Sequence, residues 1–138
     1  MRIKDCFFED IQLLAKLNQM LIEDERAETK LSLPQLESRM ADFIKSEYKA
    51  FLIYENEEII GYALCNMQKE PIYLRQFFVC RDKRRKGYGR QAFQTLLDHL
   101  NTKEIDIDVY VWNESGIAFW ESIGFEKRYY SMRYKKYS

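Results

Sequence analysis

Residues 72–111 carry a strand pattern, a helix pattern and a second strand pattern in succession, and this order restricts the possible folds most strongly. Residues 72–80 are apolar and aromatic, and residues 105–111 alternate between β-branched and polar side chains, as half-buried strands do. Between them, residues 88–100 repeat apolar side chains at helical spacing. Two strands joined through a helix lie parallel in one sheet. The sequence therefore predicts an α/β domain.

The remaining patterns add helices and antiparallel strands around this unit. Short polar turns separate the strand patterns in the middle of the chain, which is typical of an antiparallel meander. Strands are expected over residues 1–8, 50–54, 59–67, 72–80, 105–111 and 125–134. Helices are expected over residues 10–25, from the capping box of Ser32 and Gln35 onward, over 88–100 and over 115–123. The expected order is β-α-α-β-β-β-α-β-α-β, in a single domain over residues 1–138.

Composition excludes several classes of protein. No run of apolar residues is long enough to span a bilayer, and the first residues lack the zones of a secretory signal, so we expect a cytoplasmic protein. Cys6, Cys65 and Cys80 are too scattered for a disulfide framework or a zinc site. Net charge is zero, but residues 1–70 hold 9 basic and 14 acidic residues, whereas residues 71–138 hold 13 and 8. An anionic ligand would favour the second half and a cationic ligand the first.

A basic, glycine-containing loop joins the strand over residues 72–80 to the following helix. Gly87 and Gly89 flank Tyr88 where that helix begins. Glycine lets a ligand approach the backbone, and the first amides of a helix have no partners within it. These amides and the helix dipole together predict a phosphate site. The spacing fits neither a Rossmann nor a Walker loop, and a solvated basic turn is the alternative.

Two motifs resemble those of the GNAT superfamily of N-acetyltransferases. Residues 84–89 resemble its R-x-x-G-x-G signature, which binds the pyrophosphate of coenzyme A in that family. The second motif resembles the family's N-x-x-A-x-x-x-[FY]-Y-x-x-x-G-F segment in outline. It comprises Asn113, Ile117, Phe119, Trp120, Gly124 and Phe125. The resemblance implies a mixed, mostly antiparallel sheet with a splayed parallel strand pair and acetyl-CoA as the donor.

The resemblance also implies cofactor contacts. The pantetheine arm would pair with the main chain of Phe78 and Val79, Asn113 would contact the arm, and Trp120 would pack beside the thioester or in the core. The pyrophosphate would lie on the segment formed by Arg84, Arg85, Lys86, Gly87, Tyr88, Gly89 and Arg90.

N-acetylation requires a general base, a hydrogen-bond donor to the oxyanion and a general acid. An alkyl amine with a pKa near 10.4 is almost wholly protonated at pH 7, so its proton must be removed. By the resemblance, Gln76 lies at the acceptor site and cannot act as a base. The amide of Val79 is the expected oxyanion donor. The acidic cluster at the end of the first expected helix would bind the amine or accept its proton, and comprises Glu23, Asp24 and Glu25.

The identity of the general acid is open, because Trp120 occupies the position where the family often has a tyrosine. Tyr129, Tyr130, Ser115 or water are the candidates, with Tyr129 chosen as the catalytic one.

The acceptor is expected to be an amine on a small molecule or a protein, with no nucleic acid or membrane as partner. A homodimer would cover an exposed edge at the last expected strand. One alternative is a domain that binds acyl-CoA without catalysis, which turnover of acetyl-CoA with any amine would exclude. The other is a basic nucleic-acid module, which RNA binding lost at moderate salt would reject if coenzyme A binding survived.

Overall fold

The computed structural model describes residues 1–137, without the side chains of Arg85 and Lys86. Its strands are β1 (Arg2–Asp5), β2 (Tyr48–Glu55), β3 (Glu58–Asn66), β4 (Ile72–Val79) and β5 (Ile105–Ile107). Its α-helices are α1 (Ile11–Glu25), α2 (Leu33–Lys45), α3 (Tyr88–Leu100) and α4 (Glu114–Ser122). Two short 3₁₀ helices, η1 (Phe8–Asp10) and η2 (Arg81–Lys86), precede α1 and α3.

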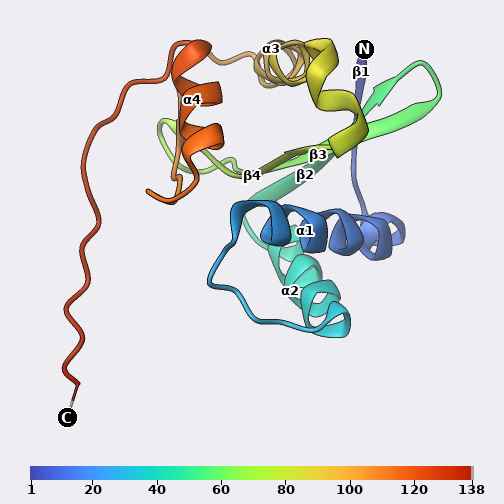
Figure 1. The fold of residues 1–138 in the computed structure, drawn as a ribbon. Coiled ribbons are helices and arrows are strands. Elements are labelled where there is room, and N and C mark those ends of the chain that lie inside the picture. The colour runs from blue at the N-terminus through green and yellow to red at the C-terminus, as the bar shows by residue number, and fades with distance from the viewer. Residues whose placement is uncertain (138) are drawn as a thin grey trace.

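The five strands form one sheet in the order β1-β2-β3-β4-β5. Neighbouring strands are antiparallel except for β4 and β5, which are parallel and joined through α3. Figure 1 shows α1 and α2 on one face of the sheet and α3 on the other. The predicted α/β fold, with one parallel pair in a mostly antiparallel sheet, is confirmed.

Apolar side chains fill both sides of the sheet. Leu14 and Leu17 of α1 pack with Tyr62 and Phe78 on one face. On the other face, Phe93 belongs to the α3 core cluster. Side chains alternate between the two faces of a sheet along each strand, so β3 and β4 contribute residues to the core on both faces.

Several local predictions are confirmed. The hydroxyl of Ser32 accepts from the amide of Gln35, and the Gln35 side chain accepts from the amide of Ser32, which is the predicted capping box. Helix α3 spans the predicted residues. Cys6 and Cys65 are buried, and burial raises the pKa of each thiol to about 12, whereas Cys80 is half-buried.

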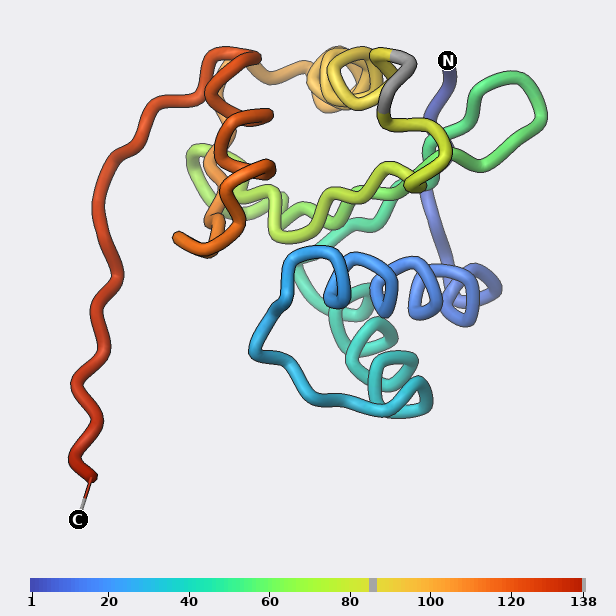
Figure 2. Tube along the Cα trace, in the orientation of Figure 1, coloured from blue at the N-terminus to red at the C-terminus, as the bar shows by residue number. Residues whose placement is uncertain are grey.

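The predicted strands at the C-terminal end are wrong in part. Residues 105–111 pair with β4 only as far as Leu74 and Ile107, and the amide of Asn113 then bonds to the carbonyl of Tyr110 in a turn. Residues 125–134 form no strand within the described chain. A strand needs a neighbour along its edge, and the turned segment beyond β5 offers none. Residues 125–137, hereafter the tail, run away from the sheet (Figure 2).

Candidate active site

A groove opens where β4 and β5 diverge. The amide of Cys80 donates a hydrogen bond to the carbonyl of Ile60 in β3 at 2.7 Å. Since bonding directions alternate along a strand, the amide of Val79 points away from β3, toward the side of β4 that β5 leaves open. The groove has a volume of about 1560 Å³, and its lining includes Asn18, Glu25, Arg39, Arg75, Gln76 and Tyr110. Small-molecule sites usually measure roughly 300–1,000 Å³, so the groove has room for an acceptor. On β4 its lining ends at Gln76, and it includes neither Val79 nor Gly87 and Gly89.

The N-terminus of α3 lies beyond the end of β4 and presents free amides. Gly87 is the N-cap at φ 75°, a left-handed conformation that glycine adopts without strain, and as a glycine it has no side chain to cap the helix. The first bond within the helix runs from the amide of Gln91 to the carbonyl of Gly87. The amides of Tyr88, Gly89 and Arg90 therefore suit an anion such as a pyrophosphate.

The described loop arginines are held by the end of α1. The Arg81 guanidinium donates to Asp24 at 2.7 Å, and Arg84 also pairs with Asp24. Arg84 Nε donates to the carbonyl of Val79 at 2.8 Å. Glu23 lies 3.6 Å from Arg81. Asp24 and Glu23 are thus placed against the loop, and the predicted side chains of residues 85 and 86 lie outside the described ones.

Glu25 is the member of the predicted acidic cluster that lines the groove. Burial and, to a smaller extent, the nearby negative charge of Asp24 together raise the pKa of its carboxyl to about 7. A carboxyl that titrates near neutral pH can accept a proton from an amine more readily than an exposed one. The structure therefore separates Glu25 from Glu23 and Asp24.

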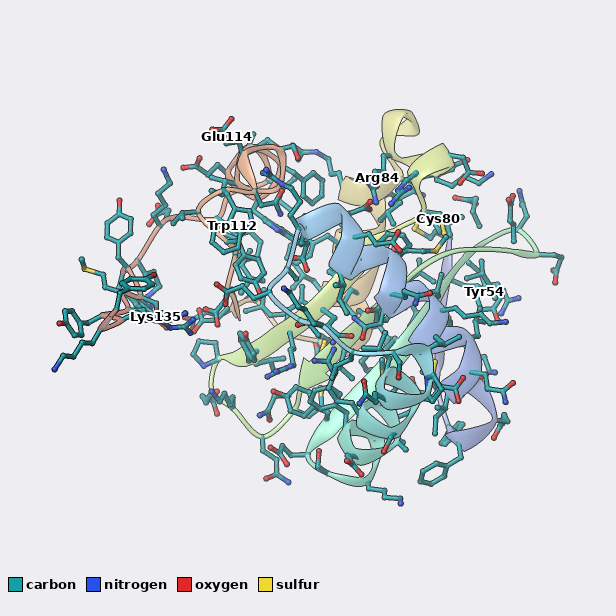
Figure 3. All side chains as sticks on the ribbon, turned by 60° about the horizontal axis from the view of Figure 1, so that its bottom comes forward. Tyr54, Cys80, Arg84, Trp112, Glu114 and Lys135 are labelled. Atoms are coloured by element: carbon teal, nitrogen blue, oxygen red, sulfur yellow. The ribbon has the colours of Figure 1, made fainter. Side chains whose placement is uncertain are left out.

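Trp112 connects the C-terminal end of α1 to the opposite wall of the groove. Its indole N–H donates to the carbonyls of Glu25 at 3.1 Å and Arg26 at 3.2 Å, and its own carbonyl accepts from the Arg26 guanidinium. The ring stacks on Tyr110 with centroids 4.5 Å apart. Figure 3 shows Trp112 beside the end of α1. This contact fixes the position of Glu25 relative to the segment after β5.

A buried polar cluster forms the floor of the groove beside Glu25. The Tyr62 hydroxyl donates to Gln76 Oε1 at 2.8 Å, and the Arg39 guanidinium donates to Asn18 Oδ1 at 2.9 Å. Burial raises the pKa of Tyr62; Glu25 raises it as well, whereas Arg39 lowers it. The Tyr62 hydroxyl thus lies within the electrostatic reach of both charged groups. Gln76 lines the groove, and its side-chain carbonyl accepts the Tyr62 hydrogen bond.

Two predicted cofactor residues have structural partners. Trp120 packs edge-on against Phe77 and Phe93, with centroids 5.3 Å and 5.6 Å away, and also borders the groove. The side chain of Asn113 accepts from the amide of Gly116 at 3.1 Å and caps α4. Trp120 thus lines the groove, whereas Asn113 lines a separate small hollow beside Trp112.

The candidates for the general acid lie on two segments. Tyr129 and Tyr130 border the groove from the tail and are 77% and 78% exposed. Ser115 lies in a separate small hollow near Asp24.

The sequence did not predict the buried polar cluster at the floor of the groove or the contacts of Trp112 with α1. Asn18 gave a usable signal, because it is a polar residue within the apolar stripe of α1 and buried polar groups need partners. Arg39, Arg75 and Trp112 gave none, since their roles depend on contacts between distant segments.

The family model for acetyltransferases of the GNAT type matches residues 14–125, most of the chain. The chain belongs to the acetyltransferase (GNAT) family. It is therefore an acetyl-CoA-dependent acetyltransferase, as the loop at the start of α3 indicated.

Among the described residues, no group of His, Cys, Asp or Glu could hold a metal ion. The described helices include none with the length and apolarity to cross a membrane.

Solved structures share the fold of this GNAT protein. A possible acetyltransferase from Clostridium difficile 630 matches with a TM-score of 0.76 and 16% identity, covering 99% of this chain and 97% of that one. An aminoglycoside antibiotic 6'-N-acetyltransferase from Acinetobacter haemolyticus gives 0.73 and 16%, covering 100% and 99%. AAC(6')-Iy, solved with a bisubstrate analogue of CoA and acetylneamine, gives 0.72 and 16%, covering 99% and 97%. At these identities the likeness concerns the fold.

Proposed function

We propose that this GNAT protein transfers an acetyl group from acetyl-CoA to a primary amine, which attacks the thioester directly. Glu25 is the general base and the main-chain amide of Val79 the oxyanion donor. The observation that carries the proposal is the Glu25 carboxyl, which lines the groove with a pKa raised to about 7. Acetyl-CoA would bind with its pyrophosphate on the first amides of α3 and its arm along the open edge of β4.

Proton removal by Glu25 has a physical basis in its surroundings. A cationic amine is attracted to the carboxylate and first passes a proton to it, directly or through one water. The neutral amine then has the lone pair that attacks the thioester carbon. Above pH 7 the carboxyl is mostly ionised and ready to accept. The proposal is supported by the contacts of Trp112, which hold the main chain of Glu25 in place.

The oxyanion proposal depends on the direction of the Val79 amide. When the amine attacks, the thioester carbonyl oxygen becomes negative, and a fixed N–H dipole stabilises it without reorganisation. The thiolate of coenzyme A then leaves and takes up a proton. Tyr129 as the donor of that proton stays a prediction, and Asn113 and Trp120 as cofactor contacts stay predictions too.

The test of the function is turnover. Release of the coenzyme A thiol is measured for wild-type protein with acetyl-CoA and a panel of amines that includes amino sugars, polyamines and amino acids. We expect at least one amine to be acetylated, with the product identified by mass spectrometry. Binding of coenzyme A without turnover of any amine class would support a non-catalytic acyl-CoA-binding domain instead.

Arg90 offers a test of the phosphate site. It is exposed at the third position of α3, where its guanidinium donates to the carbonyl of Ser122 at 2.9 Å. Arg90→Glu should weaken coenzyme A binding at least tenfold, about 1.4 kcal/mol, because a carboxylate there repels the pyrophosphate. A glutamate in the first turn favours the helix dipole, so the fold should be kept.

Calorimetry measures this affinity, and circular dichroism checks the fold. Arg90→Gln removes the guanidinium without adding a negative charge and should weaken binding less. Equal affinity of wild type and Arg90→Glu at low salt would place the pyrophosphate elsewhere.

We also propose that the chain acts as a homodimer through its tail. Apolar side chains of the tail are exposed on both sides, with Met132 at 92% and Tyr134 at 87%. A long extended segment with exposed aromatic side chains is typical of an interaction site.

Removal of residues 126–138 tests the dimer. The core clusters reach only as far as Phe125, so the truncated protein should fold. We expect wild type to sediment as a dimer and the truncated form as a monomer in analytical ultracentrifugation. A wild type that stays monomeric across the accessible concentration range would reject the dimer.

A further inference from the structure

Two arginines meet in the groove on the side away from the cofactor loop. Arg39 comes from α2 and Arg75 from β4, and both line the groove. Their guanidinium carbons lie 5.7 Å and 5.0 Å from the centre of the Phe43 ring. The pKa of Arg39 is lowered by burial and then by the positive charge of Arg75. Two like charges are therefore held together, with Arg39 half-buried and Arg75 exposed at the groove.

A bulge in β4 delivers Arg75 to this face. Leu64 of β3 is opposite Gln76, but the next residue of β3, Cys65, is opposite Leu74. Arg75 is thus the extra residue of the strand, and such bulges redirect a side chain. As a result, Arg75 reaches Tyr48 of β2 while Gln76 still faces Tyr62.

The described protein groups around the pair do not neutralise it. Arg39 donates to the neutral amide of Asn18 at 2.9 Å, and Arg75 donates to the Tyr48 hydroxyl at 3.4 Å. Among residues 1–137, neither guanidinium has a carboxylate within 4.0 Å. Of the groove carboxylates on the β5 side, Asp108 accepts from the Tyr73 hydroxyl at 2.8 Å. Each guanidinium has five N–H donors, so most remain available for a ligand.

We propose that Arg39 and Arg75 bind a carboxylate carried by the acceptor, so that the substrate of this acetyltransferase is an amine with a carboxylate at its far end. This inference rests on the proposed function, because it takes Glu25 as the group that meets the amine. A planar guanidinium binds a carboxylate through paired hydrogen bonds, which supplies both charge and orientation.

Helix α1 sets the length of such an acceptor. Asn18, which holds Arg39, and Glu25 are separated by about 10 Å along the helix, at 1.5 Å per residue. An α-amino group beside its own carboxylate is too short for this span. The acceptor is instead an ω-amino acid, or an amino acid that reacts through an amine at the end of its side chain.

The experiment compares ω-amino acids of increasing length with alkylamines of matched length. Wild type should acetylate 6-aminohexanoate with a kcat/KM at least tenfold above that of hexylamine, and shorter members of the series should be poorer. Arg75→Gln and Arg39→Gln should remove this preference by raising KM for 6-aminohexanoate, while the KM of hexylamine stays level or falls. Lys49→Gln, an exposed charge on β2 outside the groove, is the matched control and should keep the preference.

A second readout requires no catalysis. Calorimetry with the product N-acetyl-6-aminohexanoate and enzyme saturated with coenzyme A should show binding that Arg75→Gln weakens at least tenfold, whereas N-acetylhexylamine should bind both forms equally. If no amine is turned over, the function fails while this titration still decides the anion site.

Several results would overturn the anion site. These are equal binding of the two products to wild type, a preference for hexylamine, a preference for 6-aminohexyl phosphate over the carboxylate, or a carboxylate preference that survives both arginine substitutions.

Discussion

Glu25→Gln is expected to lower kcat by roughly 10²–10⁴-fold, the usual contribution of a general base. In wild type, kcat/KM should fall with decreasing pH below an apparent pKa of about 7, because protonation of Glu25 removes the base. The variant has no group to titrate there, so this acidic limb should disappear. Steady-state kinetics from pH 5 to 9 with saturating acetyl-CoA measure both effects.

The same substitution has an expected effect on stability with the opposite sign. The carboxyl titrates at about 7 in the folded protein and near 4.5 when unperturbed. Between these values the unfolded chain ionises first, so wild type loses stability as pH rises from 4.5 to 7. Glu25→Gln should therefore raise Tm relative to wild type above pH 7, and the gain should vanish below pH 4.5.

Glu23→Gln is the matched control for both measurements. It removes the same charge from the same helix end, but its carboxylate lies 3.6 Å from Arg81 and does not line the groove. It should change kcat little and leave the acidic limb in place. A Glu25→Gln enzyme with wild-type kcat and an unchanged pH profile would assign the base to another group.

Gly61→Ala is expected to be the most damaging small substitution in the sheet. A Cβ at this position would lie 2.0 Å from the carbonyl oxygen of Phe78, a contact that only movement of β3 or β4 can relieve. The loss should be roughly 1–3 kcal/mol of stability, as for other overpacked sites. Since Val79 follows Phe78 on the same strand, kcat/KM should fall as well.

Thermal unfolding and kinetics at a temperature where the variant is folded separate the two effects. Gly124→Ala is the control, because nothing lies within 4 Å of its added Cβ and only its φ of 113° opposes alanine. That variant should lose stability while keeping kcat/KM. A Gly61→Ala protein as stable and active as wild type would contradict the close approach of β3 and β4.

Local patterns in the sequence predicted most of the elements and the glycine-containing loop before α3. Periodicity of apolar residues placed α1 and α3 to within a residue, and the capping box at Ser32 placed the start of α2. These features depend on neighbours a few residues apart, which the sequence displays directly. The glycines at the start of α3 likewise report a local backbone requirement at Gly87.

Tertiary structure alone separated the members of the acidic cluster and assembled the arginine pair. Successive helix residues turn by about 100°, so neighbouring carboxylates face different directions. Asp24 contacts the loop arginines, whereas Glu25 faces the groove. Only the packing of α1 decides which of the two carboxylates faces the groove. The division of charge between the two halves of the chain did not foretell that Arg39, from the acidic half, joins Arg75.

The tail also shows that a sequence pattern alone does not determine whether a strand forms. Its alternating pattern is that of a strand, but a strand forms only where a partner edge lies alongside, and the turn after β5 takes that edge away. Side-chain alternation is a property of the segment itself, whereas hydrogen-bond partners belong to the assembled fold. For this protein the sequence therefore determined its helices, its meander and the glycine-containing loop before α3. The tertiary structure decided which charges face the groove and which strand pattern stays unpaired.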